Sequence, residues 1–129
     1  MNPPTDFIYT GFKDANGDCT VRVSPDGSSW AEDLPLRRDL YDHSEGFAWG
    51  YHGSGPAQLA LALLAHHLES RRGERSDEEK AARTNSILAM HQNFKGEVIA
   101  RLGYRCSGWI MKSSDIHDWI SDWNTSTIP

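Results

Sequence analysis

Four consecutive residues, His52-Gly53-Ser54-Gly55, have the types and spacing of an anion-binding turn. Glycine permits a tight turn, Ser54 is a good helix N-cap, and an apolar run follows. Free backbone N–H groups at a helix N-terminus attract phosphate and carboxylate groups. A tight turn without a ligand is the simpler interpretation. The alternative is a small-ligand module in which these residues bind an anion or a nucleotide, with Asp42 and His43 beside them.

Six histidines form the second group that could do chemistry. A zinc site needs three or four converging ligands, and neither an H-x-x-x-H nor a C-x-x-C spacing occurs. His67 and His91 lie on or near apolar stripes and could meet between two helices. His43 could act with Asp42 as an acid–base pair, but no nucleophile accompanies it. We therefore predict no metal, no cofactor and no catalytic residue, and a small hydrolase is the weakest alternative.

The supply of aromatic residues is the third feature. The chain has five Trp, four Tyr and four Phe, more than a small core must use. They either fill the core or form an exposed patch, and Trp and Tyr dominate binding hot spots. The predicted interaction surface consists of Trp49, Tyr51, Trp109, Trp119 and Trp123.

Composition narrows the class of protein. The chain has 129 residues and a net charge of -5, all of it carried by the first 50 residues, and this acidic half makes a nucleic-acid partner unlikely. We expect neither a secretory signal nor a membrane-spanning segment. Cys19 and Cys106 are predicted to be free thiols in a reducing cytoplasm. We expect a single domain over residues 1–129, with loose termini at 1–5 and 124–129.

The first half of the chain predicts strands. Residues 7–12 and 19–23 are rich in strand formers, and Asn16-Gly17 between them predicts a hairpin. Residues 30–44 look irregular. Phe47, Trp49 and Tyr51 alternate, which predicts one face of a short strand.

The second half predicts helices. The first spans residues 54–70, and a second follows a capping box of Ser76 and Glu79 and runs to Leu102, with a weak point at 84–86 and a stop at Gly103. An extended segment holds Trp109 to Met111, and a last amphipathic helix begins at Ser113 or Ser114. The fold class is α+β: a small antiparallel sheet packed on one face by two main helices, plus a short C-terminal helix.

Two long segments resemble a known family. Residues 42–64, DHSEGFAWGYHGSGPAQLALALL, and residues 94–102, FKGEVIARL, are similar to a family of small uncharacterised proteins of bacteria, archaea and their phages. With Trp109 and the terminal helix, the resemblance covers roughly residues 34–120. The family more often has an acidic residue at Ala48 and a glycine at His52, and residues 71–85 look longer than usual. The resemblance implies a shared fold and a prokaryotic or phage setting, and no activity.

The leading functional hypothesis is a non-enzymatic accessory protein that binds another protein, in the setting of phage–host conflict. Its basis is the surplus of aromatic residues, the small size and the family that the chain resembles. The alternative is the small-ligand module at residues 53–55. A flat exposed patch would favour the first, and a polar pocket over that turn would favour the second.

Overall fold

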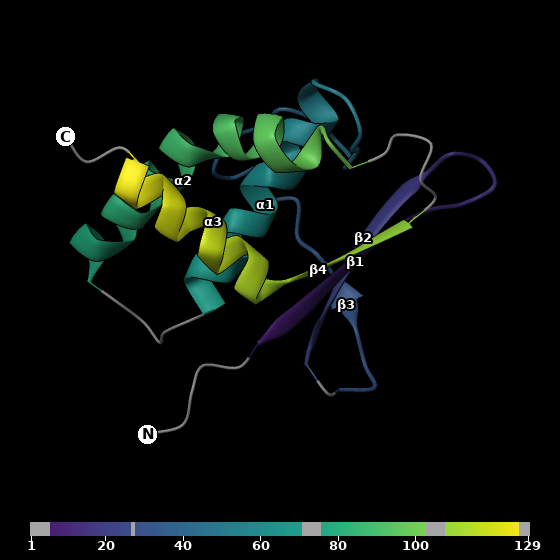
Figure 1. Cartoon of the computed structure of the whole chain (residues 1–129), viewed down its shortest axis with the longest axis horizontal. Coiled ribbons are helices and arrows are strands. Elements are labelled where there is room, and N and C mark those ends of the chain that lie inside the picture. Colours follow the sequence, from purple (N-terminus) through teal and green to yellow (C-terminus); the bar gives the residue numbers. More distant parts are fainter. Residues whose placement is uncertain (1–5, 27, 71–75, 103–107, 127–129) are drawn as a thin grey trace.

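The computed structural model describes residues 6–26, 28–70, 76–102 and 108–126. Across these ranges the chain has a four-stranded antiparallel sheet, two main helices and a shorter C-terminal helix, which confirms the predicted α+β class. Figure 1 shows the helices gathered on one side of the sheet. The loose N-terminus at 1–5, the stop at Gly103 and the second thiol, Cys106, lie outside the described residues.

The predicted hairpin is present. β1 (Phe7–Lys13) pairs antiparallel with β2 (Cys19–Pro25). The Asp14 carboxylate holds the turn between them, because its Oδ1 accepts backbone hydrogen bonds from Asn16 and Asp18 at 2.8 and 3.0 Å. Gly17 has a φ of +84°, a left-handed conformation that costs glycine little. The Asn-Gly pair therefore gives the turn that its sequence predicts.

Two more strands complete the sheet in the order β3-β2-β1-β4. β3 (Glu32–Asp33) lies beside β2, and β4 (Gly108–Lys112) pairs antiparallel with β1. The extended segment predicted at Trp109 to Met111 is thus an edge strand. Gly11 of β1 leaves room for the Trp109 indole, since a Cβ there would lie 2.3 Å from its Cε2 atom.

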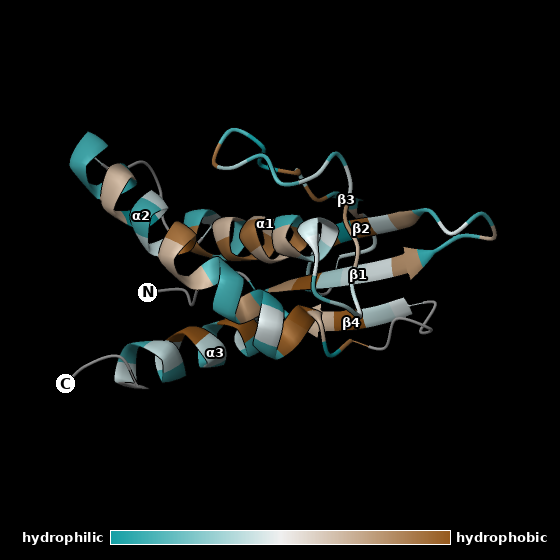
Figure 2. Cartoon of the chain, turned by 90° about the horizontal axis from the view of Figure 1, so that it is seen from above, coloured by the Kyte–Doolittle hydropathy of each residue, from teal (hydrophilic) through white to brown (hydrophobic). Residues whose placement is uncertain are grey.

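Alternation along the strands gives the sheet two different faces. The inner face packs under the helices and carries the buried side chains Tyr9, Val21, Val23, Trp109 and Met111. The outer face carries the side chains that alternate with them: Ile8, Thr10, Phe12, Arg22 and Ile110. Figure 2 shows α1 and α3 on the same side of these strands.

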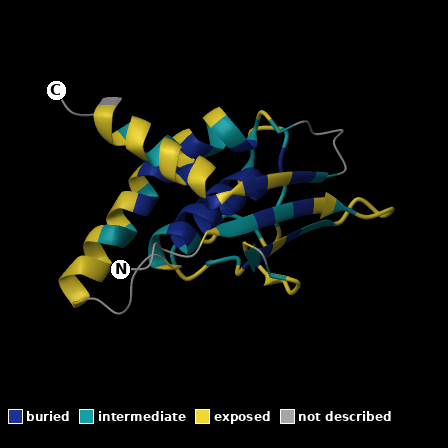
Figure 3. Ribbon diagram, turned by 60° about the horizontal axis from the view of Figure 1, so that its bottom comes forward, coloured by how far each residue is buried: buried dark blue, intermediate teal, exposed yellow. Residues whose placement is uncertain are grey.

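α1 (Ser54–Ser70) is the most buried helix, as predicted. Every residue from Gly55 to Ala65 is buried, and Figures 2 and 3 show this helix as largely hydrophobic and buried. Its N-terminus differs by one residue from the expectation. The Gly53 carbonyl accepts the first helical hydrogen bond, from the Ala57 N–H at 3.0 Å, so Gly53 takes the cap position expected for Ser54.

The predicted strand through Phe47, Trp49 and Tyr51 is wrong. These residues form no strand and share no face, since Trp49 has no exposed surface and Tyr51 is 51% exposed. Gly50 has a φ of +85°, which breaks an extended path. Its N–H donates to the Ile99 carbonyl at 3.0 Å, so the segment contacts the C-terminal end of the second helical region instead of a strand.

α2 (Asp77–Phe94) begins at the predicted capping box, where Ser76 Oγ accepts a hydrogen bond from the Glu79 N–H at 3.2 Å. Its first turns are exposed (Figure 3), and its second half packs inward. The break predicted at 84–86 is absent. The irregularity comes later, in the π-helical segment η1 (Lys95–Ile99), where the Ala100 N–H donates to the Lys95 carbonyl at 2.8 Å.

α3 (Ser113–Ser126) follows β4 directly and carries the predicted apolar face. Ile116 is buried, and Trp119, Ile120 and Trp123 pack against the core. The helix reaches three residues into the tail that the sequence predicts as loose. Among the described residues, none of the helices combines the length and the apolar character that crossing a lipid bilayer requires.

Leu63→Ala tests the central place of α1. It should lower the free energy of unfolding by about 2–5 kcal/mol, because it leaves a cavity at a fully buried position. Urea unfolding followed by circular dichroism measures this change. Ile110→Ala, at a position 72% exposed, is the control and should cost about 0.5 kcal/mol or less. Equal losses in the two variants would contradict the central place of the helix.

Candidate functional site

The glycine turn ahead of α1 is packed against its own chain. A Cβ at Gly53 would lie 2.6 Å from Cε2 of Tyr51, and one at Gly55 would lie 2.7 Å from Cβ of Ala48. Gly55 is buried, whereas Ser54 is exposed. Close packing of Tyr51 and Ala48 therefore accounts for both glycines without a ligand.

The other residues of the predicted ligand site have separate neighbours. Asp42 is exposed and pairs with Arg38 through two bonds of 2.8 and 3.0 Å. His52 is exposed and lies against η1, with its Cε1 atom 3.6 Å from where a Cβ of Gly96 would stand. His43 is half-buried and contacts α2. Asp42, His52 and His43 thus have separate neighbours, which are Arg38, the η1 segment and α2.

Gln58, which the sequence analysis did not single out, connects α1 to residues 36–44. Its side chain has no exposed surface and makes four hydrogen bonds. The amide oxygen accepts from the backbone N–H groups of His43 and Ser44 at 2.7 and 3.1 Å. The amide nitrogen donates to the carbonyls of Leu36 and Tyr41 at 2.7 and 3.1 Å. One side chain thus satisfies four backbone groups of a loop that lies on an apolar helix.

His43 and His91 join the same loop to α2. Their Nε2 atoms lie 2.9 Å apart, and the Tyr41 ring lies 4.3 Å from the His43 ring. His91 Nδ1 lies 2.7 Å from the Leu88 carbonyl, which can only accept, so Nδ1 carries the proton. In the neutral pair His43 Nε2–H therefore donates to His91 Nε2. Among the described residues, the His43 side chain contacts Tyr41 and His91, and its backbone N–H donates to Gln58.

The structure gives His67 and His91 different ring neighbours. The His67 ring lies 6.1 Å from the ring of His117 in α3, while His91 faces His43. Both helices were predicted correctly, but the stripes that carry these residues point to different neighbours. Within the described ranges, no three His, Cys, Asp or Glu residues come together as metal ligands.

The predicted aromatic surface divides into three groups. Trp49 and Trp109 are buried and pack edge to face at 5.6 Å, so they belong to the core. Trp119 and Trp123 stack at 5.7 Å and are half-buried along α3. Tyr51 is exposed and lies against Gly53. These side chains therefore form no continuous exposed patch.

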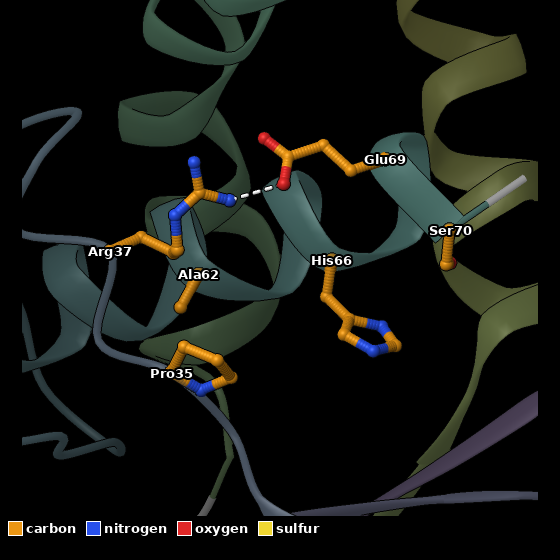
Figure 4. Close-up of a pocket in the computed structure, with 6 residues that line it drawn as sticks. All are labelled: Pro35, Arg37, Ala62, His66, Glu69 and Ser70. Carbon is orange, nitrogen blue, oxygen red and sulfur yellow. Dashed lines mark hydrogen bonds and ion pairs between the residues drawn. The ribbon is translucent and has the colours of Figure 1, made fainter. Parts of the chain in front are cut away.

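A cavity of about 230 Å³ lies beside the C-terminal half of α1. Figure 4 shows Arg37 and Glu69 facing each other on one side of it, and Pro35 and His66 on the other. Ala62, His66, Glu69 and Ser70 come from one face of the helix, because the last three lie four, seven and eight residues after Ala62. The cavity therefore lies between α1 and the same loop that Gln58 binds.

His66 in this cavity is oriented by Tyr9 of β1. The Tyr9 hydroxyl lies 2.7 Å from His66 Nδ1 and has no other partner among the described residues. Burial raises the pKa of Tyr9 and lowers the pKa of His66, so both are neutral near pH 7. The hydroxyl proton is satisfied only if Tyr9 donates to Nδ1, which leaves the His66 proton on Nε2. His66 is then a hydrogen-bond donor and no general base.

The charges in this cavity neutralise one another. The Arg37 guanidinium pairs with Asp39 at 3.0 and 3.1 Å and also donates to Glu69. Arg37 has a φ of +59°, which is unusual for a residue with a side chain. These ion pairs hold the loop to the last turns of α1. The charged groups that line this cavity, Arg37 and Glu69, are therefore already paired, and their ion pair anchors the loop to α1.

These contacts left little signal in the sequence. Gln58 is the only polar uncharged side chain between Gly55 and Ala65, and an amide inside an apolar run signals a buried hydrogen-bond network. Its partners are backbone groups, which have no sequence signature. The pairs Tyr9–His66 and His43–His91 join residues 57 and 48 positions apart. Spacing could not predict either contact.

A family of unknown function, DUF6166, matches residues 9–122. The chain belongs to this family. The resemblance seen in residues 34–120 is confirmed at that level, and the family description assigns no activity. No curated protein and no solved structure matches the chain.

Gln58→Leu tests the amide network. The variant should lose roughly 2–4 kcal/mol of stability, because four partly buried backbone groups lose their partner while the volume is nearly kept. Urea unfolding measures this loss. Gln92→Leu, at an exposed position of α2, is the matched control and should change stability by about 0.5 kcal/mol or less. A Gln58→Leu protein as stable as the parent would show that the loop is held by other contacts.

Acidification should destabilise the fold through its half-buried histidines. Burial, as the largest cause, lowers the pKa values of His43, His66 and His91 below the ordinary 6.5. In acid the unfolded chain therefore binds more protons than the native state. The stability that these histidines contribute is fully present above pH 6.5 and is lost as the pH falls below that value. The free energy of unfolding should decrease from about pH 7.5 to about pH 5.5.

Two variants test whether His91, which contacts His43 of the loop, contributes to this pH dependence. His91→Gln should flatten the decrease, because it removes one buried imidazole. Gln92→Leu, at the exposed neighbouring position, removes no titratable group and should leave the decrease unchanged. Urea unfolding at several pH values measures both. A parent protein whose stability stays level or rises on acidification would contradict the burial of these side chains.

Proposed function

We propose that this chain is a non-enzymatic binding protein that contacts another protein through the outer face of its sheet. One observation supports the proposal. The helices cover only the inner face, and the outer face exposes Ile110 by 72% and Phe12 by 42%. Large apolar side chains gathered on an open face are typical of an interaction site. This face differs from the aromatic surface that the sequence predicts.

Strand register makes these side chains neighbours. Ile110 of β4 stands opposite Thr10 of β1, and Ile8 and Phe12 lie two residues to either side of Thr10 on the same face. Diagonal neighbours of this kind lie about 7–8 Å apart, within reach of long side chains. Ile8, Ile110 and Phe12 therefore form one apolar row across two strands, here called the outer row.

The charged side chains on the outer face indicate which kind of partner surface would fit it. Lys112 stands opposite Ile8 at one end of the outer row, is exposed, and forms no ion pair with the described residues. Arg22 on the neighbouring strand already pairs with Asp33 at 3.3 Å. The face is thus apolar with one unpaired cation, in a chain whose net charge is -5. The partner that fits it is a protein with an apolar contact surface and an acidic residue facing Lys112.

The biological setting is part of the same proposal. The family resemblance of residues 42–64 supports a prokaryotic or phage origin and a role in phage–host conflict. The free thiol of Cys19 is consistent with a reducing cytoplasm. The net negative charge supports a protein partner over a nucleic acid.

Ile110→Ser tests the outer row. The variant should fold normally, because the side chain is exposed, and should capture the partner at least about tenfold less well, because the central apolar contact is lost. Chemical cross-linking in a lysate of the native host, followed by mass spectrometry, measures capture. Trp30→Ser is the control, since Trp30 is 56% exposed and lies in a loop outside the sheet. A partner retained equally by both variants, or no partner for the parent protein, would overturn the proposal.

A further inference from the structure

A second cavity of about 270 Å³ lies among the three helices. Leu68 of α1, Met90 of α2, and Ile120 and Trp123 of α3 give it apolar walls. Ser86 and Asn124 add polar groups, and Arg83 of α2 is the only charged residue in the lining as far as the described residues show. Figure 1 shows α3 passing beside α1 and α2 in this part of the molecule. The cavity therefore combines apolar walls with two neutral polar side chains and one cation.

Arg83 lacks the partners that other arginines of the chain have. Its Nε atom is buried and has no hydrogen-bond partner, and no ion pair joins Arg83 to any described residue. Arg22, Arg37 and Arg38 each pair with a carboxylate. A buried N–H without a partner costs free energy, because its hydrogen bond to water is lost and not replaced. The Arg83 Nε–H group is thus a buried hydrogen-bond donor without an acceptor among the described residues.

We propose that this cavity binds a small organic carboxylate with an apolar body. The carboxylate would accept hydrogen bonds from the Arg83 guanidinium, which suits the geometry of a planar anion. The alkyl or aryl body would lie against Leu68, Met90 and Ile120. A volume slightly below the usual range of about 300–1,000 Å³ for ligand pockets limits the ligand to a short chain or a single ring.

Both parts of this ligand are needed. An inorganic anion or acetate would pair with Arg83 but leave the apolar walls uncovered. A neutral molecule of the same shape would cover the walls but leave the cation without a counter-charge. Among the described residues that line this cavity there is no acidic side chain, in contrast to the cavity of Arg37 and Glu69, where the charges are already paired. The inference goes beyond the proposed function, since the outer row lies on the opposite face of the sheet.

Three probes separate these requirements: hexanoate, hexanamide and acetate. Each is titrated into ¹⁵N-labelled full-length protein, and amide chemical shifts give the affinity and the site. Hexanoate should bind and shift the signals of Leu68, Met90 and Ile120. Hexanamide, which lacks the charge, and acetate, which lacks the body, should each bind at least about tenfold more weakly.

Variants assign the binding to this cavity. Arg83→Gln should weaken hexanoate binding at least about tenfold, whereas Lys80→Gln, an exposed cation one turn earlier on α2, should not change it. Ala89→Leu places a larger side chain at the exposed rim and should block binding while Arg83 stays in place. Melting curves confirm that each variant is folded.

Three results would overturn the inference. These are equal affinity for hexanoate and hexanamide, full binding by Arg83→Gln or Ala89→Leu, and shifts that fall on the outer row instead of the helices. Loss of partner capture in Ile110→Ser with hexanoate binding intact would separate this site from the proposed protein contact.

Discussion

The amide of Gln58 is the interaction on which the rest of the structure depends. Residues 36–44 lie across an otherwise apolar helix, and a loop in that position would bury backbone groups without partners. The Gln58 amide oxygen accepts hydrogen bonds from two N–H groups, and its nitrogen donates to two carbonyls. All four backbone groups are thus satisfied by one side chain that is itself buried. A fully satisfied amide in a low-dielectric interior also fixes one arrangement of the loop over others.

Two further contacts hold the same loop from either side. Arg37 and Glu69 connect its beginning to the last turns of α1, and His43 and His91 connect its end to α2. The left-handed backbone at Arg37 costs about 1–3 kcal/mol, which its ion pairs help to offset. The loop thereby bridges both main helices. Four titratable side chains therefore hold the loop in place: Arg37, Glu69, His43 and His91.

The sequence predicted elements wherever the signal was local. Gly17 marked the hairpin, and Ser76 with Glu79 marked the start of α2, because turn and capping chemistry act over a few residues. The alternation of Phe47, Trp49 and Tyr51 was misleading, since a positive φ at Gly50 and a tertiary hydrogen bond to Ile99 decided the local path. The candidate site was harder to predict. The position of Gln58 in an apolar run is a local signal, but its partners, like the roles of Tyr9 and Arg83, emerge only once distant elements are brought beside them.

The open face of the sheet is a second feature that could not be predicted from the sequence alone. Strand patterning alone places Phe12 on one side of β1, but only the arrival of β4 gives it Ile110 as a neighbour. The outer row therefore belongs to the tertiary structure and is invisible in either strand alone. The same holds for the Arg83 cavity, whose walls come from three helices.

The position of β4 also bears on how the molecule is made in the cell. β1 is synthesised well before β4, yet one of its two edges is paired only by residues 108–112. Until those residues emerge, the nascent chain carries an open strand edge and an inner face without Trp109 and Met111. Such late, long-range pairing slows folding and exposes intermediates to aggregation. A chain stalled during translation before β4 would thus be a natural substrate for holdase chaperones.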